Sequence, residues 1–164
     1  REYVFNGFLF STEFARRCAA SGINIGNAVE TPDATDAWQM NVQILALCNE
    51  QRQNNGLEKL MTREDLWEQV AQVRAGEIVN YFSHTRPNGS NCFSLYDEAG
   101  LDYRAAGENI AAGYYGASAV VDGWMNSTGH RANILSESYD YLATGYATGG
   151  AYGTNYCQNF LGDW

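Results

Sequence analysis

Apolar residues in this chain follow a helical period at first and a strand-like pattern at the end, and this order limits the fold. Two stretches near the C-terminus, 141–147 and 152–160, are rich in Tyr, Thr and Gly and flank the pair Gly149-Gly150, as in a β-hairpin. Earlier, four apolar residues spaced i, i+4, i+7 and i+10 share one face of a predicted helix: Trp38, Val42, Leu45 and Cys48. Helices followed by paired strands predict an α+β layered domain rather than a parallel α/β fold.

Two more helices are predicted between these parts. The first ends near Ser83, because the Pro-Asn-Gly sequence at 87–89 favours a turn, and Arg74 alone interrupts its apolar register. The second begins near Ser118. His84 is therefore expected at or just beyond a helix C-terminus, held by the scaffold and open to solvent.

The chain divides at residues 26–36, a polar stretch with no apolar period that we interpret as a linker. Residues 1–25 are too few to bury a core alone, and their spacing predicts a helix over 14–20. They either pack on the main domain or end a preceding module. Because the chain starts at Arg1 without a methionine, we expect a processed or excised piece. Residues 37–164 then form one domain of common size.

The composition argues against nucleic acid and against a membrane-spanning helix. The chain has 10 basic and 19 acidic residues, a formal net charge of −9 and no cluster of Lys or Arg. No apolar run approaches the roughly 20 residues that a membrane helix needs. We expect no nucleic-acid partner, no transmembrane segment and a monomeric protein.

Four cysteines are present, and none belongs to a Cys-x-x-Cys pair: Cys18, Cys48, Cys92 and Cys157. That argues against a structural zinc site of the Cys-x-x-Cys type. Two disulfides in an exported protein and four buried thiols both remain open at this point.

The chain has only two histidines, and both lie in short segments that resemble parts of a site. His84 precedes the predicted turn, His130 follows a Ser-Thr-Gly sequence, and Glu108 is a lone acid in a small, apolar run between them. Two imidazoles and a carboxylate are the usual parts of a divalent-metal site or of acid–base chemistry. Two ordinary surface histidines are the alternative.

Three stretches, in order, resemble the signature motifs of bacterial domains of the CAP superfamily, also called SCP-like. They are Phe82 to Ser90 (FSHTRPNGS), Ala106 to Ala111 (AGENIA) and Trp124 to Leu135 (WMNSTGHRANIL), and the match spans about residues 38–164. Eukaryotic members include cysteine-rich secretory proteins, antigen 5 of venoms and plant pathogenesis-related protein 1. The resemblance implies a three-layer α-β-α sandwich, a secreted or cell-surface location, and a central cleft in which histidines and acids often hold a divalent cation.

Residue by residue, His84 and His130 match the two histidines of the family, and Glu108 matches the acid of its Gly-Glu-Asn motif. Ser127 stands where many eukaryotic members have a second acid, so this site has one carboxylate. The resemblance therefore implies weak binding of a divalent metal, with zinc the best candidate, by His84 and His130, while Glu108 acts directly or through a water molecule. Ser127, Asn109 and Tyr114 are expected to line the cleft.

Catalysis has two candidate residues, Glu108 and His130. Ser127 is three residues before His130, and with Glu108 it could complete a Ser-His-Glu set. Gly129 interrupts the helix there, and no Gly-x-Ser-x-Gly turn is present, so we expect Ser127 to bond backbone groups instead.

The sequence favours a binding module for a metal and an unidentified extracellular ligand, which could be a protein, a lipid or a cell-wall component. The alternative is a metal-dependent, protease-like hydrolase that uses the same His/Glu cleft. Between these, we expect a protein without enzymatic activity.

Three further expectations concern the cysteines and the N-terminal piece. In a CAP-type fold the last strand runs near the cleft, which implies a disulfide between Cys92 and Cys157. A second, between Cys18 and Cys48, would attach the N-terminal piece to the first helix. The N-terminal piece, residues 1–25, also resembles the end of a helical repeat module from bacterial surface proteins.

Overall fold

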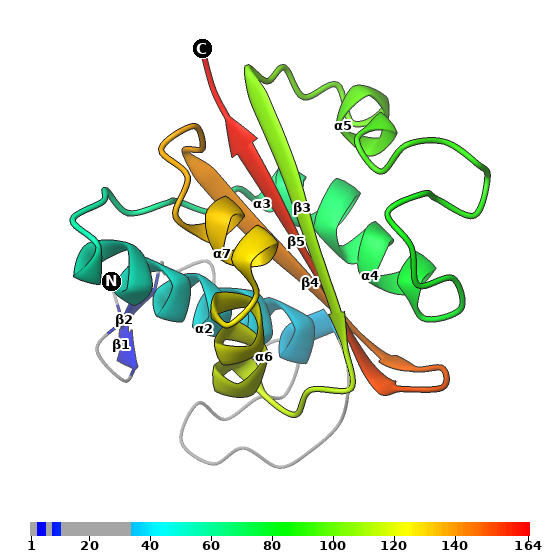
Figure 1. The fold of residues 1–164 in the computed structure, drawn as a ribbon, viewed down its shortest axis with the longest axis horizontal. Helices are drawn as coiled ribbons and strands as arrows, with labels where there is room; N and C mark the ends of the chain where they lie inside the picture. Colours follow the sequence, from blue (N-terminus) through cyan, green and yellow to red (C-terminus); the bar gives the residue numbers. More distant parts are fainter. Residues whose placement is uncertain (1–2, 6–7, 11–33) are drawn as a thin grey trace. The chain divides into compact units, whose positions relative to one another are not determined.

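The computed structural model describes residues 3–5, 8–10 and 34–164 (Figure 1). The chain forms two compact units, residues 1–36 and 37–164. In the first unit, β1 (Tyr3–Phe5) pairs antiparallel with β2 (Phe8–Phe10). The Asn-Gly dipeptide between them is a hairpin signal in the sequence. The helix predicted over 14–20 lies outside the described residues, as does most of the linker.

The second unit is built on a three-stranded antiparallel sheet with the order β3-β5-β4. Its strands are β3 (Ala105–Ala112), β4 (Tyr141–Gly149) and β5 (Gly153–Gly162). The predicted C-terminal hairpin is confirmed, and it closes where Gly149 pairs with Gly153. Gly150 in that turn has a φ of 66°, which only glycine adopts at little cost.

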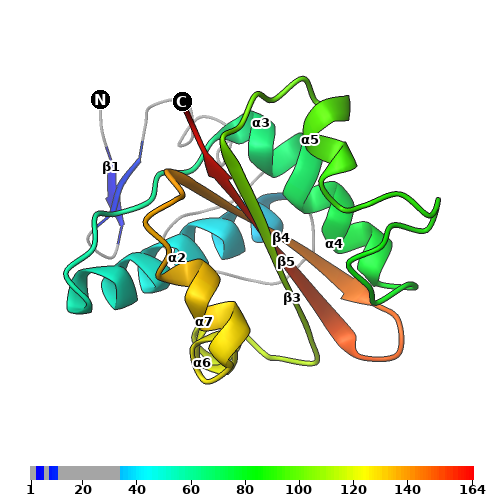
Figure 2. The same cartoon turned by 45° about the horizontal axis from the view of Figure 1, so that its top comes forward.

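Helices cover both faces of this sheet (Figures 1 and 2). One face packs against three helices: α2 (Ala34–Asn54), α6 (Ala117–Met125) and α7 (Thr128–Ile134). The other face packs against four short segments: α3 (Glu64–Leu66), the π-helix η1 (Trp67–Ala71), α4 (Gln72–Ile78) and α5 (Ser94–Glu98). This is the α+β, three-layer α-β-α sandwich that the sequence predicts.

Alternation along β5 explains why all three layers hold together. Tyr156 and Phe160 belong to the core shared with α2, α6 and α7, whereas Cys157 and Leu161 belong to the cores on the opposite face. Successive side chains of a strand point to opposite faces, so a central strand covered on both sides is buried on both. Nine consecutive residues of β5 are accordingly buried.

The π-helix η1 lies directly on β4 because Gly145 has no side chain. A Cβ atom at Gly145 would overlap the backbone carbonyl of Ala71 and lie 2.8 Å from the backbone nitrogen of Gln72. The Gln72 side chain donates to Tyr146 O at 2.8 Å and accepts from Tyr146 N at 3.0 Å. This close contact fixes α4, and with it Arg74, over the sheet.

The helix boundaries follow the sequence only in part. The predicted helix that was to end near Ser83 ends at Ile78, and the third begins at Ala117, one residue from the predicted Ser118. Within the described residues, no helix is long and apolar enough to cross a bilayer.

A pair of glycine substitutions tests the contact between η1 and β4. Gly145→Ala should destabilise the fold by about 1–3 kcal/mol or more, because the backbone of Ala71 must move. Gly76→Ala should stabilise it by about 0.5–1 kcal/mol, because Gly76 is a helical residue with open space around it. Urea unfolding of both variants measures these changes, and equal effects would contradict the close contact.

The dispensability of the N-terminal residues stays a prediction. A chain shortened to begin at Asp33 keeps all of α2 and should unfold cooperatively with the same midpoint as the full chain. The observation behind this is the division into two compact units. A lower midpoint, or loss of cooperativity in thermal unfolding, would show that residues 1–32 complete the core.

Candidate functional site

Glu108 on β3 is the centre of the site, and its carboxylate is almost completely buried, with a side chain 1% exposed. Oε1 accepts from His84 Nδ1 at 2.8 Å and from Arg74 Nη2 at 3.2 Å. Oε2 accepts from Arg74 Nε at 2.8 Å and from the Cys157 thiol at 3.3 Å. A carboxylate offers about four lone-pair positions, so Glu108 has none left for a metal.

The neighbours of Glu108 keep it ionised. Burial by itself raises the pKa of Glu108, but hydrogen bonds from His84 and Arg74 and the Arg74 charge together lower the pKa to about 2. An ionised carboxylate can only accept, so the Nδ1 of His84 must carry the proton of their hydrogen bond. The lone pair of neutral His84 is therefore on Nε2, in a side chain that is 57% exposed.

A series of ion pairs with alternating charges extends from Glu108 through Arg74. Arg74 also donates to Glu77 at 2.6 Å, Glu77 pairs with Arg86 at 2.8 Å, and Arg86 pairs with Glu98 at 2.6 Å. We call this series, Glu98–Arg86–Glu77–Arg74–Glu108, the ion-pair chain. It links α5, the loop that carries His84, helix α4 and strand β3.

Asn109 follows Glu108 on β3 and points to the opposite face of the sheet. It is fully buried, so it does not line a cleft as expected. Its amide donates to the backbone carbonyl of His130 at 3.1 Å and to Gln158 at 3.0 Å, and its oxygen accepts from Asn133 at 2.8 Å. Asn109 thus holds α7, and therefore the backbone of His130, against β3.

His130 lies on α7 and is half-buried. Burial lowers the pKa of His130, and the charge of a protonated His84 would lower it further. Adjacent residues of one strand, Glu108 and Asn109, therefore hold the ring of His84 and the backbone of His130.

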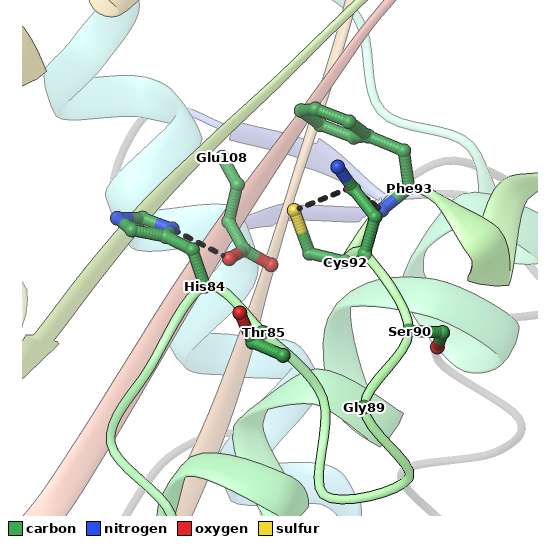
Figure 3. Close-up of a pocket in the computed structure, with 8 residues that line it drawn as sticks. His84, Thr85, Gly89, Ser90, Cys92, Phe93 and Glu108 are labelled. Atoms are coloured by element: carbon green, nitrogen blue, oxygen red, sulfur yellow. Dashed lines mark hydrogen bonds and ion pairs between the residues drawn. The ribbon is translucent and has the colours of Figure 1, made fainter.

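A pocket of about 420 Å³ lies beside His84 (Figure 3). It is lined by His84, Thr85, Glu108 and the loop residues 89–93. The turn predicted over 87–89 is present, with Gly89 N bonded to Arg86 O at 2.9 Å. Tyr114 and Ser127, which we expected along the cleft, do not line this pocket.

The predicted disulfide between Cys92 and Cys157 is wrong, and the one between Cys18 and Cys48 involves a residue outside the described ones. Cys48, Cys92 and Cys157 are free and buried, while Cys18 lies outside the described residues. Instead of pairing, the Cys157 thiol donates to Glu108. Burial and the nearby Glu108 charge raise the pKa of Cys92 to about 12, so it stays a neutral thiol and is unsuited to act as a nucleophile.

The Ser-His-Glu set considered from the sequence is not assembled. Glu108 bonds to His84, not to His130, among the contacts of the described residues. Ser127 is the N-cap residue of α7, where its side chain makes no capping hydrogen bond. Tyr114 lies against Gly123, and a Cβ atom at Gly123 would be 2.6 Å from the Tyr114 ring. The backbone carbonyl of Tyr114 accepts a hydrogen bond from the Tyr156 hydroxyl.

The donor set fits a metal only as a two-histidine site. Within residues 3–5, 8–10 and 34–164, no group of three or more His, Cys, Asp or Glu side chains could hold a metal ion. Glu108 is saturated, so any metal would depend on His84 Nε2 and His130, with solvent or ligand in its other positions.

Comparison with known sequences agrees with this geometry. The sequence profile described as CAP, the cysteine-rich secretory protein family, matches residues 45–160. The chain belongs to the CAP family.

Similar proteins come from bacteria. The chain is 33% identical over 150 residues to the uncharacterized protein YkwD, and 37% identical over 128 residues to the uncharacterized membrane protein YlbC, both of Bacillus subtilis. These matches cover 90% and 74% of this chain but only 56% and 34% of the relatives. The CAP domain therefore spans only part of the length of the curated relatives that it matches.

Solved structures give the same fold. An extracellular SCP-domain protein from Bacillus anthracis superposes with a TM-score of 0.71 at 30% identity, over 84% of this chain and 45% of that one. An outer surface protein from Borrelia burgdorferi superposes with a TM-score of 0.70 at 16% identity, over 84% of this chain and 100% of that one. At that identity, the second match supports the fold alone.

Arg74, Glu77 and Arg86 are site residues that the sequence motifs did not identify. The available signal was the position of Arg74, a charged residue in the apolar register of a predicted helix. A buried position for that arginine requires an acidic partner, and Glu108 was the isolated acid.

The lowered pKa of Glu108 predicts a specific acid sensitivity. Stability from this group is fully present above its ordinary pKa of about 4.5 and is lost as the pH falls towards about 2. Between pH 5 and pH 3, native protein should lose about 2 kcal/mol more of its unfolding free energy than Glu108→Gln.

Urea unfolding at pH 5, 4 and 3 measures this difference. Asp65→Asn is the matched control, because Asp65 is a carboxylate paired with an arginine but 36% exposed. If Glu108→Gln and native protein lose stability in parallel, Glu108 is not the buried anion described above.

Proposed function

We propose that this CAP domain binds a divalent cation through His84 Nε2 and His130, and presents it to an extracellular ligand. The observation that carries the proposal is the 2.8 Å hydrogen bond from His84 Nδ1 to a carboxylate that Arg74 keeps ionised. Histidines that ligate metals commonly donate their other nitrogen to a carboxylate, which fixes the tautomer and makes the ligating nitrogen more basic.

The state of His130 supports the same assignment. A metal needs neutral imidazole, and burial lowers the pKa of His130. Protons therefore compete less well for this nitrogen at neutral pH. Zinc is the best candidate for nitrogen ligands, and two protein ligands give a modest affinity.

The ligand is proposed to lie in the pocket beside His84. Its lining is uncharged except for His84 and the saturated Glu108, and its hydroxyl and amide groups come from Thr85, Ser90 and Asn91. Pockets of this volume suit a small molecule or one segment of a larger one. A protein, a lipid and a cell-wall component remain the classes of ligand to be tested.

We place the protein outside the cell or at its surface, as a monomer, and the N-terminal piece as the remnant of a preceding surface-protein module. The support for the location is that the similar SCP-domain protein of Bacillus anthracis is extracellular.

The hydrolase alternative has less support. Glu108 is fully occupied by donors and has a pKa of about 2, which is far from what a general acid or base needs near neutral pH. A hydrolase would have to rely on His130 and a metal-bound water. We therefore propose a binding module rather than an enzyme, and Ser127→Ala is expected to change any activity no more than a few-fold.

Calorimetric zinc titration at pH 7.5 tests the cation site. His84→Ala and His130→Ala should each abolish most of the binding, and the double variant should be little worse than either one. Glu108→Gln should weaken binding by about 10- to 100-fold, because it acts on the metal through His84. At pH 5.5 binding to native protein should fall, because protons compete for the imidazoles.

Asn41→Ala provides the control, because Asn41 is as deeply buried as Glu108 but bonds to Thr144 N and Thr62, away from the histidines. It should lower stability and leave zinc affinity unchanged. Unchanged affinity in His84→Ala would mean that the histidines are structural and that the function depends on another surface.

A further inference from the structure

Arg74 is the most deeply buried charged residue of the site, and it does not line the pocket. Its side chain is 0% exposed. Its guanidinium donates twice to Glu108, once to Glu77 and once to the backbone carbonyl of Ser83, over distances from 2.6 to 3.2 Å. The Nη2 atom is shared between Ser83 and Glu108. Arg74 is therefore held on three sides by parts of the chain that surround His84.

Two of these contacts restrain His84, one at its backbone and one at its imidazole ring. Arg74 Nη2 donates to Ser83 O at 2.7 Å, which fixes the backbone immediately before His84. Arg74 also holds both oxygens of Glu108, whose Oε1 accepts from the imidazole at 2.8 Å. The backbone and the ring of His84 are therefore both fixed by one guanidinium.

A third contact links Arg74 to the pocket loop. Arg74 binds Glu77 at 2.6 Å, and Glu77 binds Arg86, which lies two residues after His84. The loop returns to His84 through the bond from Cys92 N to His84 O at 3.2 Å. Arg74 thus connects the histidine to the segment that lines the pocket.

We propose that Arg74 is the positioning residue of His84, and that it fixes where the free Nε2 of that ring lies without touching the cation or the ligand. The proposal rests on the proposed function, in which His84 Nε2 is a cation ligand. An arginine suits this role because its planar group presents five donors in fixed directions, whereas a lysine presents three donors around one point.

The decisive comparison is between Glu108→Gln and the double variant Arg74→Met/Glu108→Gln. Arg74→Met alone leaves the carboxylate of Glu108 buried without its main partner, which is strongly destabilising. The double variant avoids this, because Glu108→Gln removes the buried negative charge and Glu77 keeps its pair with Arg86. Arg74→Lys is the second variant. It retains the positive charge, and it keeps the proposal testable if the double variant does not fold.

Two measurements are made on each variant. The first is the long-range proton–nitrogen spectrum of the imidazoles without metal, which reports the tautomer of each ring. The chain has only two histidines, so His84→Ala assigns both sets of signals. The second is zinc affinity by calorimetry, with zinc alone as the probe.

We expect Arg74→Met/Glu108→Gln to give a His84 ring averaged between tautomers, with the His130 signals unchanged, and a zinc affinity at least about tenfold below that of Glu108→Gln. Arg74→Lys should keep the His84 tautomer and weaken zinc binding by a smaller factor. Identical His84 signals and identical zinc affinity in the double variant and in Glu108→Gln would overturn the proposal, and so would a native affinity in Arg74→Lys.

Arg52→Met is the matched control for loss of a buried arginine. Arg52 is 2% exposed and donates to the backbone carbonyls of Glu58, Ile134 and Ser136. Arg52→Met should lower stability and leave the His84 tautomer unchanged. If it changes the His84 signals as much as the Arg74 variants do, the effect of those variants reflects general destabilisation and not positioning. If native protein binds no zinc but Arg74 still governs the His84 signals, the cation site fails and the positioning role stands.

Discussion

The buried ion pair between Arg74 and Glu108 is the interaction on which the site depends. Its closest atoms are 2.8 Å apart, and both side chains are removed from solvent. Removing two charges from water costs several kcal/mol each, and a buried pair often returns no more than that. The pair is therefore a poor source of stability. Its effect is geometric, because the guanidinium orients a carboxylate that in turn orients the ring of His84.

The α+β class of the fold could be predicted from local patterns, but one strand of the sheet could not. The helical face of α2 and the Gly-Gly hairpin between β4 and β5 are visible within a few residues of sequence. Strand β3 is different, because its sequence is mostly Ala and Gly with a single β-branched residue, Ile110. It is a strand because β5 provides a partner along its whole length, and that partner lies far along the chain.

The same limit explains what could be learned about the site. The motifs identified His84, Glu108 and His130 as members, since the residue types themselves indicate the chemistry. They could not show that Glu108 is an inner hydrogen-bond acceptor, because its donors come from residues 34 and 49 positions away, Arg74 and Cys157. The disulfide prediction failed for the related reason that cysteine spacing does not show whether a thiol faces another sulfur or an acceptor.

Strand β3 also positions the ring of His84 and the backbone of His130. Neighbouring residues on a strand point to opposite faces, so Glu108 reaches the His84 side and Asn109 reaches α7. Asn133 of α7 donates to the Glu108 carbonyl at 3.4 Å and to Asn109 at 2.8 Å, which holds that helix along the strand. His130 lies three residues before Asn133, on the same side of the helix. The ring of His84 and the backbone of His130 are therefore both held by one dipeptide of a paired strand, which is a rigid element even though His84 itself lies in a loop.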